Sequence, residues 1–332
     1  MAEYWVRYVR RFDSLLEDAL RLAIKATMQN LYKCVHGDGT MAPSPLIKMN
    51  LYLSGKDIIY IPSRLEVLDT FTTVLDEIIH IMSTVPRLFE KFGLPAAGLK
   101  KFWEVIQNDA DCNKLQTLID AEIEYNVSLI NEHIHMWDPY MHIWKVNKNQ
   151  FMQKYREENH TAADFDELII NYSALANTVQ IQETINQIHF ITLNSSELKK
   201  SIIAHCLVWQ TKLGELLRKI TESDIDKVFQ YVERSSEDAM KMPADLKDLA
   251  TAIATYERLI ADIPIIEKTF PPISDKMVTL AKFEVELSSD MVTRHENIPA
   301  IWSEYLLLLE EAKKNLEMNK DKFKAELLEQ AE

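Results

Sequence analysis

The chain has 332 residues, of which 47% are hydrophobic and 27% charged, the balance of a folded globular protein rather than a disordered one. Its 37 basic and 51 acidic residues give a formal net charge of −14, which disfavours nucleic acid as a partner because an acidic surface repels phosphates. Only 6 glycines and 11 prolines occur, so long helices with short connections are favoured over a glycine-rich nucleotide-binding fold.

Cysteine usage and hydropathy indicate a reducing compartment. Cys34, Cys112 and Cys206 are odd in number and far apart, which argues against a disulfide framework. No apolar run reaches the roughly 18–20 uncharged residues of a membrane span, and the charged N-terminal segment differs from a secretory signal. We therefore expect a soluble, intracellular protein with no membrane partner.

The first predicted element is one amphipathic helix from residue 3 to about 34. Apolar side chains recur there at steps of three and four residues: Trp5, Tyr8, Phe12, Leu15, Ala19 and Leu22. The basic cluster Arg7, Arg10 and Arg11 is interpreted as a solvated face. A membrane-surface helix is the alternative, which the acidity of the rest of the chain disfavours.

A β-hairpin is predicted next, at about 46–61. Two runs rich in Ile, Leu and Tyr, 46–53 and 58–61, flank a turn that contains Gly55. An isolated hairpin is marginal in water, so we expect it to pack against a helix. Ser63 and Glu66 then form a capping-box pattern, which begins a helix predicted to continue to about residue 92.

Helices separated by proline-containing breaks are predicted for the rest of the chain. Their expected ranges are about 100–136 with a break near 109–112, 140–159, 164–193 capped by Asp164, 196–243, 245–263, and a last helix after 297–299, with 270–273 as a further break. Heptad-like seams run through 202–220 and 298–323. We predict an all-α fold with one small β-hairpin, arranged as an elongated helical bundle with coiled-coil-like packing.

Nucleotide-binding and metal-binding signatures are missing from the sequence. There is no G-x-x-x-x-G-K-[ST] motif, and Gly55 has neither an earlier glycine nor a following hydroxyl residue at the required spacing. His133, His135 and His142 lie close together along the chain, but no H-x-x-x-H or H-E-x-x-H pair is present. We interpret these histidines as a polar rim, and expect no cofactor and no metal.

Two further pairs invite a catalytic interpretation, and neither has the required spacing. His205 and Cys206 are adjacent, and adjacent residues of a helix do not face each other, so Cys206 is predicted to be a core residue. Asp76 and His80 are four residues apart and are predicted to be a surface pair, since nothing nearby supplies a nucleophile. We expect no catalytic residues, and therefore no enzyme activity.

One segment carries a family resemblance. Residues 137–155, WDPYMHIWKVNKNQFMQKY, resemble the dynein heavy-chain stem, in which W-x-P-[YF]-x-x-x-W precedes a polar stretch and a phenylalanine. The matching residues are Trp137, Pro139, Tyr140, Trp144 and Phe151. The resemblance continues in register at Trp209 and at Pro271 and Pro272, and covers most of the chain.

The resemblance is stronger to axonemal than to cytoplasmic heavy chains. The predicted hairpin followed by Pro62 and Ser63 is similar to the strand–turn–strand and following helix of axonemal heavy chains. One departure is Asn147, where an acidic residue is often found; it bears on subtype only.

The resemblance implies a non-catalytic stem segment just upstream of the linker, which transmits motor force; the ATPase modules of the family lie outside this sequence. Implied partners are dynein intermediate chains, light chains and other heavy chains, with microtubules contacted only indirectly, in the cytoplasm and cytoskeleton and in the axoneme of a cilium or flagellum. It also implies three segments: N-terminal stem helices with the hairpin at 1–136, a central bundle at 137–270, and a C-terminal helical segment at 271–332 leading toward the linker.

Two other classes of protein compete with this interpretation. A free-standing helical scaffold or tethering protein, unrelated to a motor, would be supported by internal repeats, but the tryptophans at 5, 103, 137, 144, 209 and 302 are unevenly spaced. An all-helical enzyme would need a pocket with convergent titratable groups, of which the sequence gives no sign.

Overall fold

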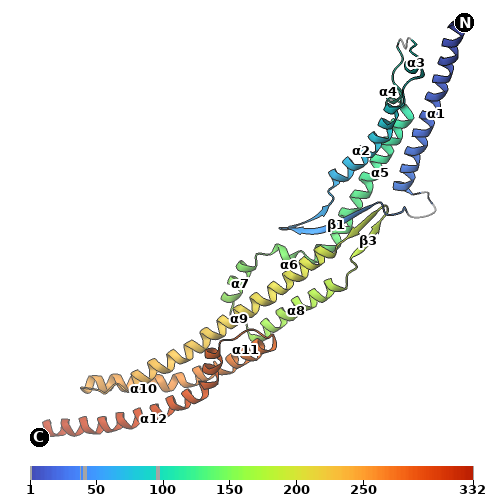
Figure 1. Ribbon diagram of the computed structural model, residues 1–332. Coiled ribbons are helices and arrows are strands. Elements are labelled where there is room, and N and C mark those ends of the chain that lie inside the picture. The colour runs from blue at the N-terminus through green and yellow to red at the C-terminus, as the bar shows by residue number, and fades with distance from the viewer. Residues whose placement is uncertain (1, 38, 40–42, 95–97, 332) are drawn as a thin grey trace. The chain divides into compact units, whose positions relative to one another are not determined.

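The chain is mostly helical and contains one small mixed sheet (Figure 1). The computed structural model describes residues 2–37, 39, 43–94 and 98–331. They form two compact units, each described here by itself: unit 1 is Met1–Lys145 with Thr178–Ala204, and unit 2 is Val146–Asn177 with His205–Glu332. None of the described helices is both long and apolar enough to cross a lipid bilayer.

Unit 1 is built on α1 (Ala2–His36) and α5 (Ala110–Ile134), which pack side by side. Its other helical elements are α2 (Arg64–His80), the 3₁₀ helix η1 (Ile81–Thr84), α3 (Leu88–Lys91), α4 (Phe102–Gln107), the 3₁₀ helix η2 (His135–Tyr140) and α6 (His142–Lys145). The predicted break near 109–112 is confirmed. The Asp109 carboxylate there accepts hydrogen bonds from the backbone N–H groups of Asp111 and Cys112 and so begins α5.

The predicted N-terminal helix is confirmed, but it packs through a different face from the predicted stripe. Its buried side chains are Val9, Asp13, Ile24, Met28 and Val35. The side chains of the stripe are exposed. Among its large side chains, the exposed fraction ranges from 44% at Phe12 to 67% at Leu22. Helix α1 therefore has two apolar faces, and unit 1 covers only one of them.

The helix that begins after Ser63 is shorter than predicted. The capping box is present: Ser63 Oγ accepts from Glu66 N at 3.4 Å, and Ser63 N donates to Glu66 Oε2 at 2.6 Å. However, the helix ends at His80 instead of continuing to residue 92. The chain continues as the 3₁₀ helix η1 to Thr84. Pro86 stops it there, because a residue that precedes proline avoids the α conformation, and Val85 is extended.

The predicted hairpin is confirmed as β1 (Ile47–Ser54) and β2 (Asp57–Ile61), but it belongs to a larger sheet. Two further strands, β3 (Ile185–Ile188) and β4 (Ile191–Asn194), give the order β2-β1-β4-β3, with β1 and β4 parallel. The predicted helix 164–193 is therefore wrong beyond Ile181. Its last residues alternate buried Ile191 and Leu193 with half-buried Thr192 and Asn194, the period of a strand.

Unit 2 contains the longest helices of the chain. They are α7 (Lys148–Glu157), α8 (Ala162–Ile181), α9 (Ser196–Ala239), α10 (Leu246–Glu267), α11 (Phe270–Lys282) and α12 (Ser289–Ala331), of which α8 and α9 also contribute residues to unit 1. The predicted seams are confirmed as buried faces, with Trp209 and Trp302 1% and 6% exposed. Both seams become half-buried toward their C-terminal ends, at Ile220 and from Leu316 onward.

The helix boundaries of unit 2 differ from the prediction at several points. The predicted helix 140–159 is interrupted before α7, which begins at Lys148 after its cap Asn147. Helix α9 ends at Ala239 rather than at 243, and the predicted break at 270–273 is the first turn of α11.

Helix α10 continues through Pro264 to Glu267, and α12 begins at Ser289 rather than after Pro299. A proline removes one backbone hydrogen bond, and here packing on both sides compensates for that loss. Asp164 does not cap α8 but occupies its first turn, where its carboxylate accepts from Thr161 N at 2.7 Å.

Candidate functional site

The first half of the tryptophan–proline motif forms the corner between α5 and α6 in unit 1. Pro139 has no N–H, so an α-helix cannot continue regularly through it, and the chain adopts the 3₁₀ helix η2 instead. Trp137 and Trp144 are both buried. The Trp144 indole Nε1 donates to the backbone oxygen of Lys56 at 3.1 Å, in the turn of the β1–β2 hairpin. Trp144 therefore holds the hairpin against the helices of unit 1.

The second half of the motif contributes to an aromatic cluster in unit 2. The Phe151 ring lies edge-on to Trp209 with 5.1 Å between centroids, and Tyr172 is stacked parallel to Trp209 at 4.9 Å. Burial raises the pKa of Tyr172 to about 12, which keeps its hydroxyl protonated. The cluster joins α7, α8 and α9 through desolvated rings. It is a packing centre.

Asn147, where the resemblance leads us to expect an acidic residue, caps helix α7. Its side-chain oxygen caps α7 by accepting from the backbone N–H of Asn149 at 3.1 Å and of Gln150 at 3.3 Å. Asparagine and aspartate cap a helix N-terminus about equally well. The substitution therefore removes a charge and keeps the cap.

Lys148, His205 and Cys206 also lie around Trp209. The Lys148 ammonium is 5.2 Å from the centre of the Trp209 ring and 3.2 Å from His205 Nδ1. Burial, reinforced by the charge of Lys148, lowers the pKa of His205, so its neutral form is favoured. Cys206 is buried as predicted, and burial raises its pKa, so a thiolate nucleophile is disfavoured.

The proline pair begins α11. Pro271 and Pro272 are the second and third residues of α11, in its first turn, where a missing N–H removes no intrahelical hydrogen bond. The preceding Phe270 lies edge-on to Trp302 with 5.3 Å between centroids, and Trp302 Nε1 donates to Glu267 at 3.0 Å. The proline pair thus directs the chain into a second aromatic core, formed by Val232, Leu259, Trp302, Tyr305 and Leu309.

The clustered histidines of unit 1 have separate partners. His133 Nε2 is 3.2 Å from Asn186 Nδ2, His135 Nδ1 is 2.9 Å from an Asp138 oxygen, and His142 Nδ1 is 2.9 Å from the Pro139 carbonyl oxygen. Among the described residues, no group of three or more His, Cys, Asp or Glu side chains could hold a metal ion.

The predicted surface pair of Asp76 and His80 does not form in the structure. His80 Nε2 instead lies 3.5 Å from Ser83 Oγ, on the following turn.

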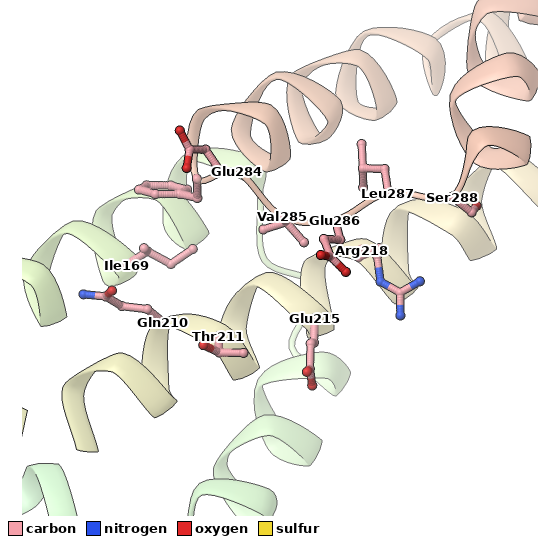
Figure 2. Close-up of a pocket in the computed structure, with 11 residues that line it drawn as sticks. Ile169, Gln210, Thr211, Glu215, Arg218, Glu284, Val285, Glu286, Leu287 and Ser288 are labelled. Atoms are coloured by element: carbon pink, nitrogen blue, oxygen red, sulfur yellow. The ribbon is translucent and has the colours of Figure 1, made fainter. Parts of the chain in front are cut away.

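A cleft of about 700 Å³ lies in unit 2 between α8, α9 and the 283–288 segment that connects α11 to α12 (Figure 2). Its hydroxyl groups serve the backbone: Thr211 donates to the Leu207 carbonyl oxygen, and Ser288 Oγ accepts from Met291 N. The segment crosses α9 at Gly214, where a Cβ would lie only 2.8 Å from Val285 Cγ2. This close crossing was not predicted from the sequence, although a lone glycine inside a long helix is its signal.

The motif residues make packing contacts within their units. One comparison with known proteins matches a family model that is itself described as a coiled coil. Residues 211–331, which include α10, α11 and α12, match the family model described as Dynein axonemal heavy chain 2/5/8 coiled-coil. The match includes the second aromatic core.

Individual relatives extend this similarity over nearly the whole chain. Dynein axonemal heavy chain 2 of Homo sapiens is 30% identical over 99% of this chain, and that of Mus musculus is 29% identical over the same share. The Dynein-1-beta heavy chain of the flagellar inner arm I1 complex of Chlamydomonas reinhardtii is 24% identical over 96%. The chain is thus homologous to a region of axonemal dynein heavy chains. It spans 8% of the length of the two mammalian relatives and 7% of the algal one.

Proposed function

We propose that this chain is a non-catalytic structural segment of the stem of an axonemal dynein heavy chain, just upstream of the linker. The observation that carries the proposal is the shared core of α9, α10 and α12, built around Trp302 and Tyr305 within the stretch that matches the coiled-coil model. A core of this kind stabilises helices against one another.

The same core supports a role in transmitting motor force. Helix α12 has 43 residues, which corresponds to a length of about 65 Å. A single helix under tension is held only by its own hydrogen bonds, whereas side chains packed against neighbouring helices share the load. Trp302 contributes to this packing in two ways. Its ring lies against Phe270, and its indole N–H donates a hydrogen bond to Glu267.

Assembly and location follow as parts of the proposal. The partners would be dynein intermediate chains, light chains and other heavy chains, with microtubules contacted only indirectly, in the axoneme of a cilium or flagellum. The motif residues Trp137, Trp144, Phe151 and Trp209, with the proline pair of α11, would act as packing anchors. The proposed segments are 1–136, 137–270 and 271–332.

The first experiment is to read the source transcript beyond the codon for Glu332. Sequences for P-loop modules and a stalk-like heptad region would support a motor stem. A stop codon there would overturn the proposal in favour of a free-standing helical scaffold or tethering protein.

The second experiment tests the mechanical role in the full-length heavy chain. Trp302→Ala should reduce ciliary beat frequency even where the amount of the heavy chain in isolated axonemes is normal, because load transfer through the core is weakened. Val278→Ala, on a side chain that is 69% exposed, is the matched control. Equal beating in both variants at equal occupancy would contradict force transmission through this core.

A further inference from the structure

The packing of unit 1 does not explain the second apolar face of α1. We call the six residues Trp5, Tyr8, Phe12, Leu15, Ala19 and Leu22 the α1 stripe. Trp5 is 50% exposed, Tyr8 54% and Leu15 56%, whereas the opposite face of α1 is buried against α5 and the short helices (Figure 1). Single exposed apolar residues are ordinary, but an ordered row of them is typical of an interaction site.

The spacing of the α1 stripe identifies the kind of partner. Its members follow one another at 3, 4, 3, 4 and 3 residues, the a and d positions of a heptad repeat. A second helix matches such a row, because each of its a and d side chains can insert between four side chains of α1. A membrane-binding helix would present a wider apolar face than two positions in seven.

The α1 stripe is also held in a fixed orientation. Asp13, on the buried face of α1, accepts from Arg87 Nη1 at 2.7 Å and from Leu88 N at 2.9 Å, and both charged side chains are 4% exposed. At the N-terminal end of the stripe, the Phe92 ring lies edge-on to Trp5 with 6.0 Å between centroids. Phe92 is itself 52% exposed, so it extends the apolar surface beyond α1. A preorganised surface loses little entropy when it binds.

Charge determines which helix fits. Arg7 and Arg11 lie along one flank of the α1 stripe, and both are exposed. Asp18 lies on the same flank, but it is paired with Arg21 at 3.9 Å. Within the described part of the chain neither forms an ion pair, whereas Lys25 further along α1 is paired with Asp111. The net charge of −14 disfavours a second copy of this chain and an anionic membrane as occupants, because both would be repelled.

We propose that the α1 stripe is a docking surface for an amphipathic helix of a different polypeptide, with apolar residues at its a and d positions and acidic residues beside them. Aromatic and arginine side chains are the residues that most often dominate binding energy at such surfaces. As an account of assembly with associated chains, this inference rests on the proposed function. The surface itself is argued only from the exposure, spacing and charge of α1.

The test uses the full 332-residue chain and two fluorescent synthetic peptides of three heptads. Both have leucine at a and d; one has glutamate at e and g, and its twin has lysine there, so that neither pairs with itself. Fluorescence anisotropy should give saturable binding of the glutamate peptide, at least ~10-fold tighter than that of the lysine peptide. Leu15→Asp should weaken this binding ~10-fold or more, because it buries a charge in the seam.

Matched variants separate docking from folding. Leu65→Asp changes a leucine that is 76% exposed on α2 and should leave peptide binding unchanged. The double variant Arg7→Glu/Arg11→Glu should reverse the preference between the two peptides. Circular dichroism should show unchanged helix content in Leu15→Asp, since Leu15 is on the exposed face.

Four results would overturn the proposal: no saturable binding of the glutamate peptide, equal binding of both peptides, binding of the chain to phosphatidylserine vesicles through the stripe, or dimerisation of the chain that Leu15→Asp abolishes. The last two would assign the surface to a membrane or to a second copy. None of these results bears on whether the transcript encodes motor modules, so failure here is distinguishable from failure of the proposed function.

Discussion

Removal of the Arg87 guanidinium should destabilise unit 1 far more than removal of a surface arginine. Arg87 donates to Asp13 at 2.7 Å, to Glu17 at 2.6 Å and to the Lys100 carbonyl oxygen at 2.9 Å. Its guanidinium also lies 4.0 Å from the centre of the Phe102 ring. One side chain therefore links α1, α3 and the start of α4.

The size of the effect follows from burial. Arg87→Met would leave the Asp13 carboxylate buried, with the Leu88 N–H as a neutral partner and no cation nearby. Breaking a buried ion pair from one side costs about 3–5 kcal/mol. Since about 1.4 kcal/mol corresponds to a factor of ten, local opening of α1 and α3 should become roughly 10²- to 10³-fold more frequent or higher. The double variant Arg87→Met/Asp13→Leu should recover part of this loss, because it leaves no unpaired charge.

Amide hydrogen exchange read by mass spectrometry measures this opening separately in each segment. Exchange in α1, α3 and α4 should accelerate in Arg87→Met, while exchange in α12 of unit 2 serves as the internal reference. Arg64→Met is the matched control, because Arg64 pairs with Glu124 at 2.6 Å within the same unit but on its exposed surface. Equal acceleration in Arg64→Met and Arg87→Met would refute the reasoning that burial makes the difference.

Three further predictions concern packing and pH. Trp209→Ala and Trp302→Ala should each cost about 3–5 kcal/mol, because both side chains are buried; an unchanged melting temperature would remove that residue from the core. Gly214→Ala should lower the melting temperature despite its better helix propensity, by overpacking worth about 1–3 kcal/mol against Val285, and Gly214→Ala/Val285→Ala should restore it; stabilisation by the single change would contradict the close crossing. Burial lowers the pKa of His133 below its ordinary 6.5, so the unfolded chain binds the proton more readily and unit 1 should lose stability as the pH falls below about 6.5. His133→Gln should remove that pH dependence in melting curves, and an unaltered dependence would assign it to another group.

Local signals explain the parts of the fold that were predictable from the sequence. The Ser63–Glu66 capping box needs only four residues, and both of its hydrogen bonds are present. The seams through Trp209 and Trp302 repeat often enough along α9 and α12 to outweigh individual exceptions. Asp245 begins α10 as predicted, because its side chain accepts from Asp248 N at 2.6 Å.

The errors arose where a distant contact decides the local structure. Residues 185–194 have apolar positions that suit a helix or a strand, and pairing with β1, far away along the chain, selects the strand. Pro264 and Pro299 are ordinarily helix breakers, yet burial of Leu259 and Ile298 nearby keeps both helices continuous. The stripe on α1 was visible as a periodic pattern, but periodicity does not say which of two apolar faces the rest of the chain covers.

For the candidate site, the sequence predicted a set of residues and not how they are grouped. Trp144 bonds to the hairpin turn in unit 1, while Phe151 and Trp209 meet in unit 2. The motif is continuous in sequence, but η2 and α6 belong to unit 1 and α7 belongs to unit 2. Spacing alone could not reveal that division.

The pairing of β1 with β4 sets an order of events on the ribosome. Strand β1 ends at Ser54 and β4 ends at Asn194, so 194 − 54 = 140 residues must be synthesised before the central pair of the sheet can close. At roughly 5–20 residues per second, this delay is about 7–28 s. During that interval the β1 edge has unpaired backbone groups on a nascent chain, and unpaired strand edges are sites of mispairing between neighbouring chains. Slowing of elongation between codons 54 and 194 should therefore raise aggregation more than the same slowing after codon 204, where unit 1 is already complete.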